Sequence, residues 1–249
     1  MTVQESDDEQ LGLSLSALDA LKEFYAERDA REKAFAELQA EAERIRREAI
    51  PLTMEPFVED WNKSQFWYSD KTATLYAKQL LQDNMRADST IAVVSAPSAF
   101  IALKNLLNAA PAEQPRPKVV LLEHDHRFEI FPEFVFYDVM QPFKLPAELK
   151  GTADAIICDP PFLSEDCQTK AALTVRWLAK PITADATTSP KVILSTGERV
   201  GTLVTAKLYK SFGLRTTTYE PVHARGLSNE FYCYANFEAS DGSWTWKTE

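Results

Sequence analysis

The stretch that decides the fold is ADAIICDPPF at residues 153–162. Its first part is a short and nearly continuous apolar run, which is typical of a strand buried on both faces of a parallel sheet. Its second part is a turn with two successive prolines, which fix the backbone and end the strand. An Asp-Pro-Pro turn also occurs as a plain rigid bend. In an open α/β sheet, however, ligands bind beyond the carboxyl ends of the strands, and this turn lies at such an end.

Short apolar runs and helical stretches alternate along the rest of the chain after Pro51. This alternation predicts an α/β fold, in which helices cover both faces of a mostly parallel sheet. The last two strands have no helix between them, so we expect an antiparallel pair at one edge. The predicted strands lie at 90–95, 118–123, 134–138, 153–159, 191–196, 214–222 and 231–237. The predicted helices after Pro51 lie at 69–85, 98–109, 165–178 and 198–212.

The N-terminal segment differs from the rest in charge and in pattern. Residues 1–50 carry 13 acidic and 7 basic side chains, and residues 17–49 contain neither Gly nor Pro. This composition predicts one long helix that ends before Pro51. We therefore divide the chain into an acidic helical extension at 1–50 and a main domain at 51–249. The helix either lies on its own domain, docks a partner or forms a short coiled coil.

Composition excludes several classes of protein. The net charge of −10 argues against a surface that binds nucleic acid phosphates. No apolar run approaches the roughly 20 residues that span a bilayer, and the acidic first ten residues resemble no leader peptide. Three cysteines without a CxxC pair fit a reducing compartment, so we expect a cytoplasmic protein. No glycine lies between Gly12 and Gly151, which excludes the glycine-rich loops of dinucleotide and phosphate sites.

Polar residues stand at four predicted strand ends. They are the turn Ser95-Ala96-Pro97, then Glu123, Asp138 and Asp159. This set suits a cofactor that contains a nucleoside: Glu123 would accept the ribose hydroxyls and Asp138 the adenine amine. Asp125 is an alternative ribose ligand, since it lies two residues after the strand. Each acid alone could equally be a helix cap or a turn former.

The Asp-Pro-Pro-Phe turn has a chemistry of its own. Pro160 and Pro161 have no N–H groups, so the carboxylate of Asp159 and the carbonyl of Pro160 can hold an N–H donor at a fixed angle. Phe162 offers a flat wall to a planar base or a cation. A nitrogen held in this way keeps its lone pair directed at an incoming methyl group, so catalysis is mainly positioning. The turn matches the (Asp/Asn)-Pro-Pro-(Tyr/Phe/Trp) motif of methyltransferases that act on amino groups.

The chain from about residue 57 to 238 resembles the eukaryotic lysine methyltransferases of translation elongation factor 1A, once described as N6-adenine DNA methyltransferases. The resemblance implies a seven-stranded, Rossmann-like class I sheet, S-adenosylmethionine as methyl donor and a lysine ε-amine of elongation factor 1A as acceptor. In the same stretch, Trp67 and Tyr68 would cover the cofactor or substrate, or simply pack in the core. The resembling stretches are QFWYS at 65–69, VSAPS at 94–98, LLE at 121–123, FYD at 136–138, DPPF at 159–162 and NEFYCY at 229–234.

Two other functions remain open at this point. The same turn could hold an adenine amine, although an acidic chain suits a basic protein substrate better than a nucleic acid. The fold could also serve as a non-catalytic binding protein of the translation machinery. No metal is expected, because the adjacent side chains from Glu123 to His126 diverge at a strand end.

Overall fold

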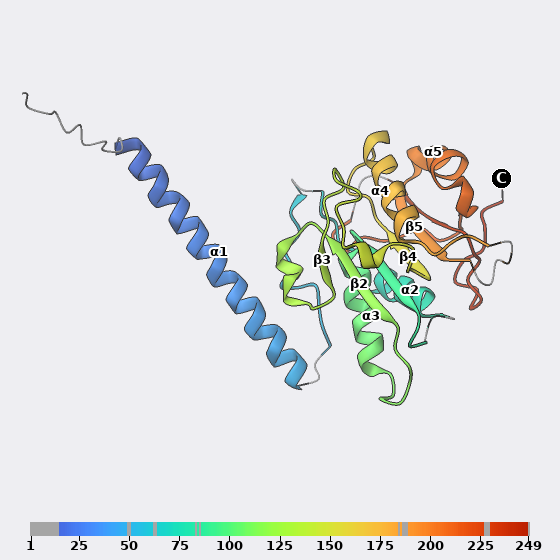
Figure 1. Cartoon of the computed structure of the whole chain (residues 1–249), viewed down its shortest axis with the longest axis horizontal. Coiled ribbons are helices and arrows are strands. Elements are labelled where there is room, and N and C mark those ends of the chain that lie inside the picture. The colour runs from blue at the N-terminus through green and yellow to red at the C-terminus, as the bar shows by residue number, and fades with distance from the viewer. Residues whose placement is uncertain are drawn as a thin grey trace, which may run out of the picture. The chain divides into compact units, whose positions relative to one another are not determined.

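The computed structural model describes residues 15–48, 51–61, 64–82, 84, 86–183, 185, 189–226 and 230–248. The chain divides into one unit at Met1–Glu48 and a second at Ala49–Glu249. Figure 1 shows the elements of both units.

The first unit contains a single helix, α1 (Leu15–Glu48), close to the predicted range; residue 49 lies outside the described residues. Exposed ion pairs at helical spacing, such as Lys22 with Asp19 and Arg28 with Glu32, run along it. Such pairs stabilise a helix only slightly, by about 0.3–0.5 kcal/mol each. No helix in the described part of the chain is long and apolar enough to cross a membrane.

The second unit is built on a seven-stranded sheet, as predicted, with the order β3-β2-β1-β4-β5-β7-β6. Strands β1 to β5 are parallel, whereas β7 runs antiparallel to both β5 and β6. The predicted antiparallel pair at one edge is therefore confirmed. The strands are β1 (Thr90–Val94), β2 (Lys118–Glu123), β3 (Phe134–Phe136), β4 (Ala155–Cys158), β5 (Lys191–Gly197), β6 (Arg215–Thr216) and β7 (Phe231–Ala235).

Two apolar layers cover the sheet because successive strand residues point to opposite faces. Ile91 and Val93 pack in the layer that includes α2 (Asp70–Leu81) and α3 (Pro97–Ala109). Ala92 and Val94 pack in the other layer, which includes α4 (Glu165–Leu178). Helix α2 is shorter than the predicted 69–85, and residue 85 lies outside the described residues.

The single helix predicted at 198–212 is wrong. A 3-10 turn at Glu198–Val200 leads into the short helix α5 (Gly201–Leu203), a π-helical turn at Val204–Leu208 and a 3-10 turn at Lys210–Phe212. The Thr205 hydroxyl donates to the carbonyl of Gly201 at 2.8 Å, a back-bond that disturbs regular helix. Glycine and β-branched residues in the first turns also weaken the helix.

The strand predicted at 214–222 shrinks to two residues, β6. Just beyond β6, Thr217 forms a bridge with Trp246, and the Tyr219 hydroxyl lies 2.8 Å from that of Thr72 on α2. Regular pairing ends here although Thr217 and Tyr219 still hydrogen-bond to Cys233 of β7, because the chain also makes these contacts with α2 and the C-terminal segment. The β-branched pattern of the sequence does not reveal such long-range contacts.

Candidate active site

The predicted strand ends meet where the strand order reverses, between β1 and β4. Val94 is paired with Leu122 on one side and with Cys158 on the other. The amide of Asp159 donates to the carbonyl of Val94 at 3.0 Å. Ser95 after β1, Glu123 at the end of β2 and Asp159 after β4 therefore lie side by side at the carboxyl edge of the sheet. By alternation, the side chains of the two acids point toward the face covered by α2 and α3.

The turn after β1 contains a residue in an unusual backbone conformation. Ser95 has φ +53°, in the left-handed region that glycine adopts without strain. Its amide donates to the carbonyl of Leu122 at 2.9 Å, and Pro97 then begins α3. Ala96, between them, is buried. The chain thus makes a tight strand-to-helix turn without the glycine that such turns usually contain.

We expect Ser95→Gly to stabilise the protein by up to about 2 kcal/mol, because a non-glycine residue in this region is strained by about 1–3 kcal/mol while glycine loses about 0.5–1 kcal/mol of chain entropy. Ser95→Val should destabilise it, since a β-branched residue tolerates positive φ poorly. Urea denaturation of the three proteins measures both changes. If Ser95→Gly is less stable than wild type, contacts of the serine side chain stabilise the protein by more than the backbone strain at this position destabilises it.

Glu123 and Asp125 have different surroundings, which bear on the choice of ribose ligand. Glu123 is 6% exposed, and its Oε1 accepts hydrogen bonds from the amides of His124 (2.9 Å) and Asp125 (3.1 Å). Its Oε2 has no hydrogen bond with any described residue. Burial raises the pKa of Glu123 to about 7, although the two amides lower it. The Asp125 carboxylate instead accepts hydrogen bonds from the side chain of Gln65 and, at both of its oxygens, from the guanidinium group of Arg127.

Two of the predicted cofactor residues are engaged by other groups of the protein. The carboxylate of Asp138 accepts from the amide of Met140 (2.8 Å) and the side chain of Gln141 (3.0 Å), which lowers its pKa and shapes the turn after β3. The Trp67 indole is buried, and its N–H donates to the carbonyl of Phe57 at 2.6 Å. The described contacts of the Trp67 ring are those of core packing.

Tyr68 is directly connected to the Asp-Pro-Pro-Phe turn. Its hydroxyl donates to Oδ2 of Asp159 at 2.6 Å. Burial raises the pKa of Asp159 to about 8, against the lowering effect of this hydrogen bond, and the nearby charge of Glu123 raises it further. Beyond Asp159, Pro160 is buried whereas the Phe162 ring is 48% exposed. The turn therefore combines a half-buried carboxyl group with an accessible aromatic wall.

Gln168 on α4 supports the turn, a role that the motifs of the sequence do not predict. Its Nε2 donates to the carbonyl of Phe162 at 2.9 Å and to the Thr196 hydroxyl at 3.0 Å. The side chain is fully buried, and its Oε1 has no partner among the described residues. A glutamine on the buried face of an amphipathic helix, six residues after the motif, is the signal that could have identified it.

We expect Gln168→Leu to destabilise the protein by about 1–3 kcal/mol, because two buried acceptors would lose their donor. Methyl transfer should fall about tenfold, since groups that support a functional residue typically contribute a factor of 10–100. Thermal denaturation and initial rates measure the two effects. Equal stability and activity in the variant would show that the turn keeps its shape without this donor.

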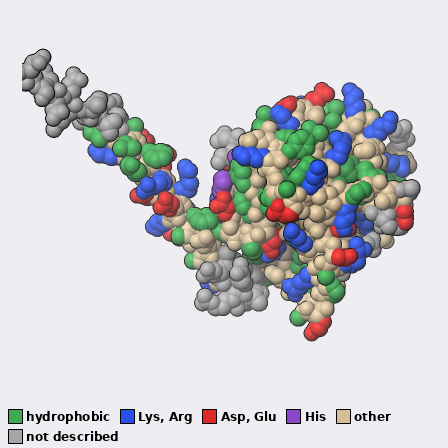
Figure 2. All heavy atoms as spheres, viewed as in Figure 1, with side chains coloured by type: hydrophobic (Ala, Val, Ile, Leu, Met, Phe, Trp, Pro, Cys, Tyr) green, Lys and Arg blue, Asp and Glu red, His purple; other side chains and the backbone are tan. Residues whose placement is uncertain are grey.

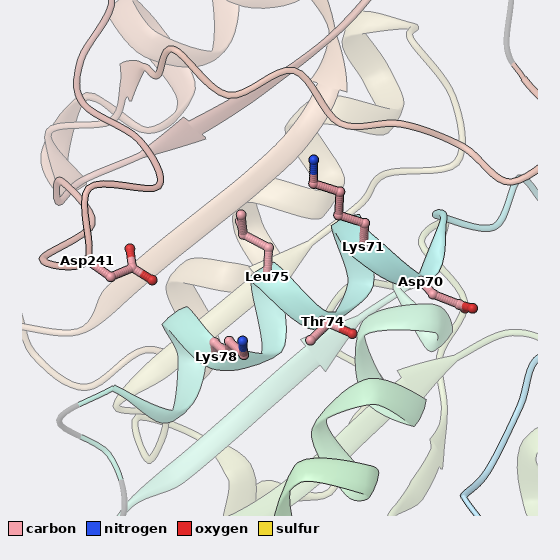
Figure 3. Close-up of a pocket in the computed structure, with 6 residues that line it drawn as sticks. All are labelled: Asp70, Lys71, Thr74, Leu75, Lys78 and Asp241. Carbon is pink, nitrogen blue, oxygen red and sulfur yellow. The ribbon is translucent and has the colours of Figure 1, made fainter.

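A hollow on the surface lies elsewhere, along the solvent side of α2. Figure 3 shows its lining residues, which are Asp70, Lys71, Thr74, Leu75 and Lys78 on α2 and Asp241 of the C-terminal segment. None of its lining residues belongs to the strand-end cluster. The described residues contain no group of three or more His, Cys, Asp or Glu side chains that could hold a metal ion.

Comparison with known proteins identifies the family. A family model described as "Probable N6-adenine methyltransferase" matches residues 59–239. "Protein-lysine N-methyltransferase EFM5" of Saccharomyces cerevisiae is 41% identical over 93% of this chain and 93% of its own. "EEF1A lysine methyltransferase 1" of Homo sapiens is 34% identical over 94% of this chain and 95% of its own. The protein of the same name in Gallus gallus is 33% identical over 94% of this chain and 98% of its own. These matches confirm the resemblance seen in the sequence: the chain belongs to the elongation factor 1A lysine methyltransferase family, whose family model carries the N6-adenine description.

Proposed function

We propose that this protein is an S-adenosylmethionine-dependent lysine N-methyltransferase that modifies translation elongation factor 1A. The observation that carries the proposal is the position of Asp159. Its Oδ2 is held by Tyr68, while its Oδ1 has no hydrogen bond with any described residue and is not among the fully buried unpartnered atoms. An amine can approach this oxygen from solvent. The names of the near-full-length relatives supply the substrate.

The strand-end cluster fits the methyl donor. S-adenosylmethionine supplies a methyl group on a positively charged sulfur atom and carries a ribose with two hydroxyl donors. The side chain of Glu123 is buried as a whole, but its Oε2 has no hydrogen bond with the described residues and is not among their fully buried unpartnered atoms, so it suits these donors. The turn at Ser95, Ala96 and Pro97 lets the backbone approach the ligand closely. We assign Asp138 to the adenine amine, and Trp67 and Tyr68 to the wall between the cofactor and the core.

The residues of the turn would orient the acceptor amine. Oδ1 of Asp159 and the carbonyl of Pro160 accept its N–H groups, and Pro161 keeps the two acceptors at a fixed angle. Phe162 covers one side of the amine or of the cation that it forms. Holding a nucleophile in line with its target contributes several kcal/mol to a transfer reaction, about 7–11 kcal/mol at best.

Charge favours a protein acceptor over a nucleic acid. The chain has a net charge of −10. On the face seen in Figure 2, basic and acidic side chains are interspersed over the folded domain rather than gathered into a basic surface. A duplex that must be bound and opened to expose an adenine requires such a surface. An adenine-containing nucleic acid is the second candidate, supported only by the description of the family model.

The remaining assignments follow from this function. A translation factor as substrate places the enzyme in the cytoplasm. We keep the division into an acidic helical extension at 1–50 and a catalytic domain at 51–249, close to the compact units of the structure. No metal is assigned to the reaction.

The test offers labelled S-adenosylmethionine to the full-length protein together with elongation factor 1A, and in parallel with an adenine-rich oligonucleotide. We expect label on a lysine of the protein substrate, located by mass spectrometry. Label on the oligonucleotide instead would establish the second candidate. Cofactor binding by calorimetry without transfer to either acceptor would contradict the proposed substrate and favour a non-catalytic role.

A further inference from the structure

One side chain contact joins two parts of the site that are 91 residues apart in the sequence. It is the hydrogen bond from the Tyr68 hydroxyl to Oδ2 of Asp159, at 2.6 Å. Tyr68 is only 3% exposed. It stands just before α2, outside the motif, and neither the strand pattern nor the turn itself assigns it a task in the reaction.

The position of Tyr68 is fixed from several directions. Its amide donates to the Ser98 hydroxyl in the first turn of α3, at 3.2 Å. On the other side, Tyr68 forms an antiparallel bridge with His223. The Tyr68 ring packs edge-on against Tyr76, with centroids 5.4 Å apart, and lies 5.2 Å from the ring of His223. A side chain held in this way can determine the orientation of the group that it touches.

The two oxygens of the carboxylate therefore have different environments. Oδ2 accepts from a buried phenol, whereas Oδ1 has no hydrogen bond with the described residues and is not among their fully buried unpartnered atoms. A carboxylate with only one oxygen held by the protein presents the other to a ligand at a defined angle. We propose that Tyr68 is a positioning residue that holds Asp159 so that its Oδ1 takes a proton from the ammonium group of the substrate lysine.

This inference rests on the proposed function, because it concerns the lysine that the enzyme would methylate. In the proposed step, an N–H bond of the ammonium breaks and its electron pair stays on nitrogen. The proton forms an O–H bond at Oδ1, so an ammonium and a carboxylate become an amine and a carboxylic acid. The neutral amine then has the lone pair that methyl transfer requires.

The electrostatics of the site agree with this role. Burial raises the pKa of Asp159 to about 8, which brings its basicity much closer to that of an amine than an exposed aspartate would be. The hydrogen bond from Tyr68 lowers the pKa of Asp159, so it keeps part of the carboxylate ionised near neutral pH. Burial also raises the pKa of Tyr68, so the phenol remains a donor. The other titratable groups around this pair are Glu123 after β2, Tyr76 on α2, Cys158 on β4 and His223 in the segment before β7.

The variant Tyr68→Phe removes the hydroxyl and keeps the ring. We expect kcat to fall about tenfold, in line with groups that support a functional residue, while the Kd for S-adenosylmethionine stays unchanged. Loss of the donor raises the pKa of Asp159. The acidic limb of the pH profile of kcat should therefore move to higher pH by about one unit. The profile is measured at saturating levels of both substrates, so that Glu123 does not contribute through cofactor binding.

Tyr137→Phe is the matched control. Its hydroxyl is also buried and lies 2.9 Å from the Thr174 hydroxyl, on the other face of the sheet. This control loses one buried hydrogen bond but should leave the pH profile in place. Identical pH profiles for Tyr68→Phe and wild type would overturn the inference, whatever the change in rate.

Two further measurements keep the test decisive if Tyr68→Phe folds poorly. 3-Fluorotyrosine at position 68 makes the phenol a stronger donor, so the acidic limb should move to lower pH. Titration of the Asp159 carboxyl carbon by NMR, assigned with Asp159→Asn, reports the same change without any methyl acceptor. If wild type methylates elongation factor 1A but neither the acidic limb nor the pKa of Asp159 changes, only the inference fails. If wild type methylates no lysine, the proposed function fails.

Discussion

We expect Asp159→Ala to reduce kcat for lysine methylation about 10³-fold, while the Kd for S-adenosylmethionine stays within about threefold of wild type. The variant removes both the acceptor that orients the amine and the group that takes its proton. Rapid-quench assays with labelled cofactor measure the first quantity, and calorimetry measures the second. Asp166→Asn is the control, because Asp166 is an exposed acid on the first turn of α4 and pairs with Lys170.

Asp159→Asn separates the two roles of the carboxylate. Asparagine can still accept a hydrogen bond from the amine and from Tyr68, but it cannot take a proton at neutral pH. We expect its kcat to lie between those of Asp159→Ala and wild type. A kcat equal to that of wild type would show that Asp159 only orients the amine and that the proton goes elsewhere.

The same substitution should change the pH dependence of stability. The pKa of Asp159 is raised in the folded protein to about 8, from about 3.8 when exposed, so folding favours the protonated form. The contribution of this group to stability is therefore complete below its unfolded pKa and is lost as the pH rises toward 8. Asp159→Asn removes this loss. We expect the stability of the variant relative to wild type to rise from about pH 4 to about pH 8 and to level off above that, as measured by urea denaturation.

The second large effect concerns the methyl donor. We expect Glu123→Gln to weaken S-adenosylmethionine binding about 10- to 100-fold, because an amide cannot accept two ribose hydroxyls as a carboxylate does. Asp125→Asn should change the Kd by less than about threefold, since the Asp125 carboxylate is already engaged by Arg127 and Gln65. Calorimetry with the two variants measures these values. The reverse order of effects would assign the ribose to Asp125.

The pH dependence of cofactor binding gives an independent check. The pKa of Glu123 is raised to about 7 by burial, and the ionised form is the one that accepts two hydroxyl donors. Affinity should therefore increase with pH through about 7 and level off above 8. Glu123→Gln should lose this dependence. A cofactor affinity of wild type that does not vary with pH would show that Glu123 does not change its charge when the cofactor binds.

The sequence allowed the sheet to be predicted well because its strands are buried on both faces and so read as uninterrupted apolar runs. The runs at 90–95, 118–123, 153–159 and 191–196 each lie within about two residues of an observed strand. The prediction failed at 198–212 and 214–222, where Thr205 bonds back to Gly201 and Thr217 pairs with Trp246. The first contact is local and depends on how the Thr205 side chain is oriented, whereas the second joins segments that are distant in the sequence.

What the sequence by itself determined is the set of strand-end groups: Ser95, Glu123 and Asp159 each follow an apolar run, and the parallel arrangement of those runs brings their ends to one edge. Only the tertiary structure decided how each group is used. It occupies Asp125 with Arg127, leaves one oxygen of Glu123 unpaired among the described residues, and places the hydroxyl of Tyr68 on Asp159. The physical reason is that a residue's position along the chain follows from local patterns, whereas its hydrogen-bond partners depend on which distant segments pack beside it.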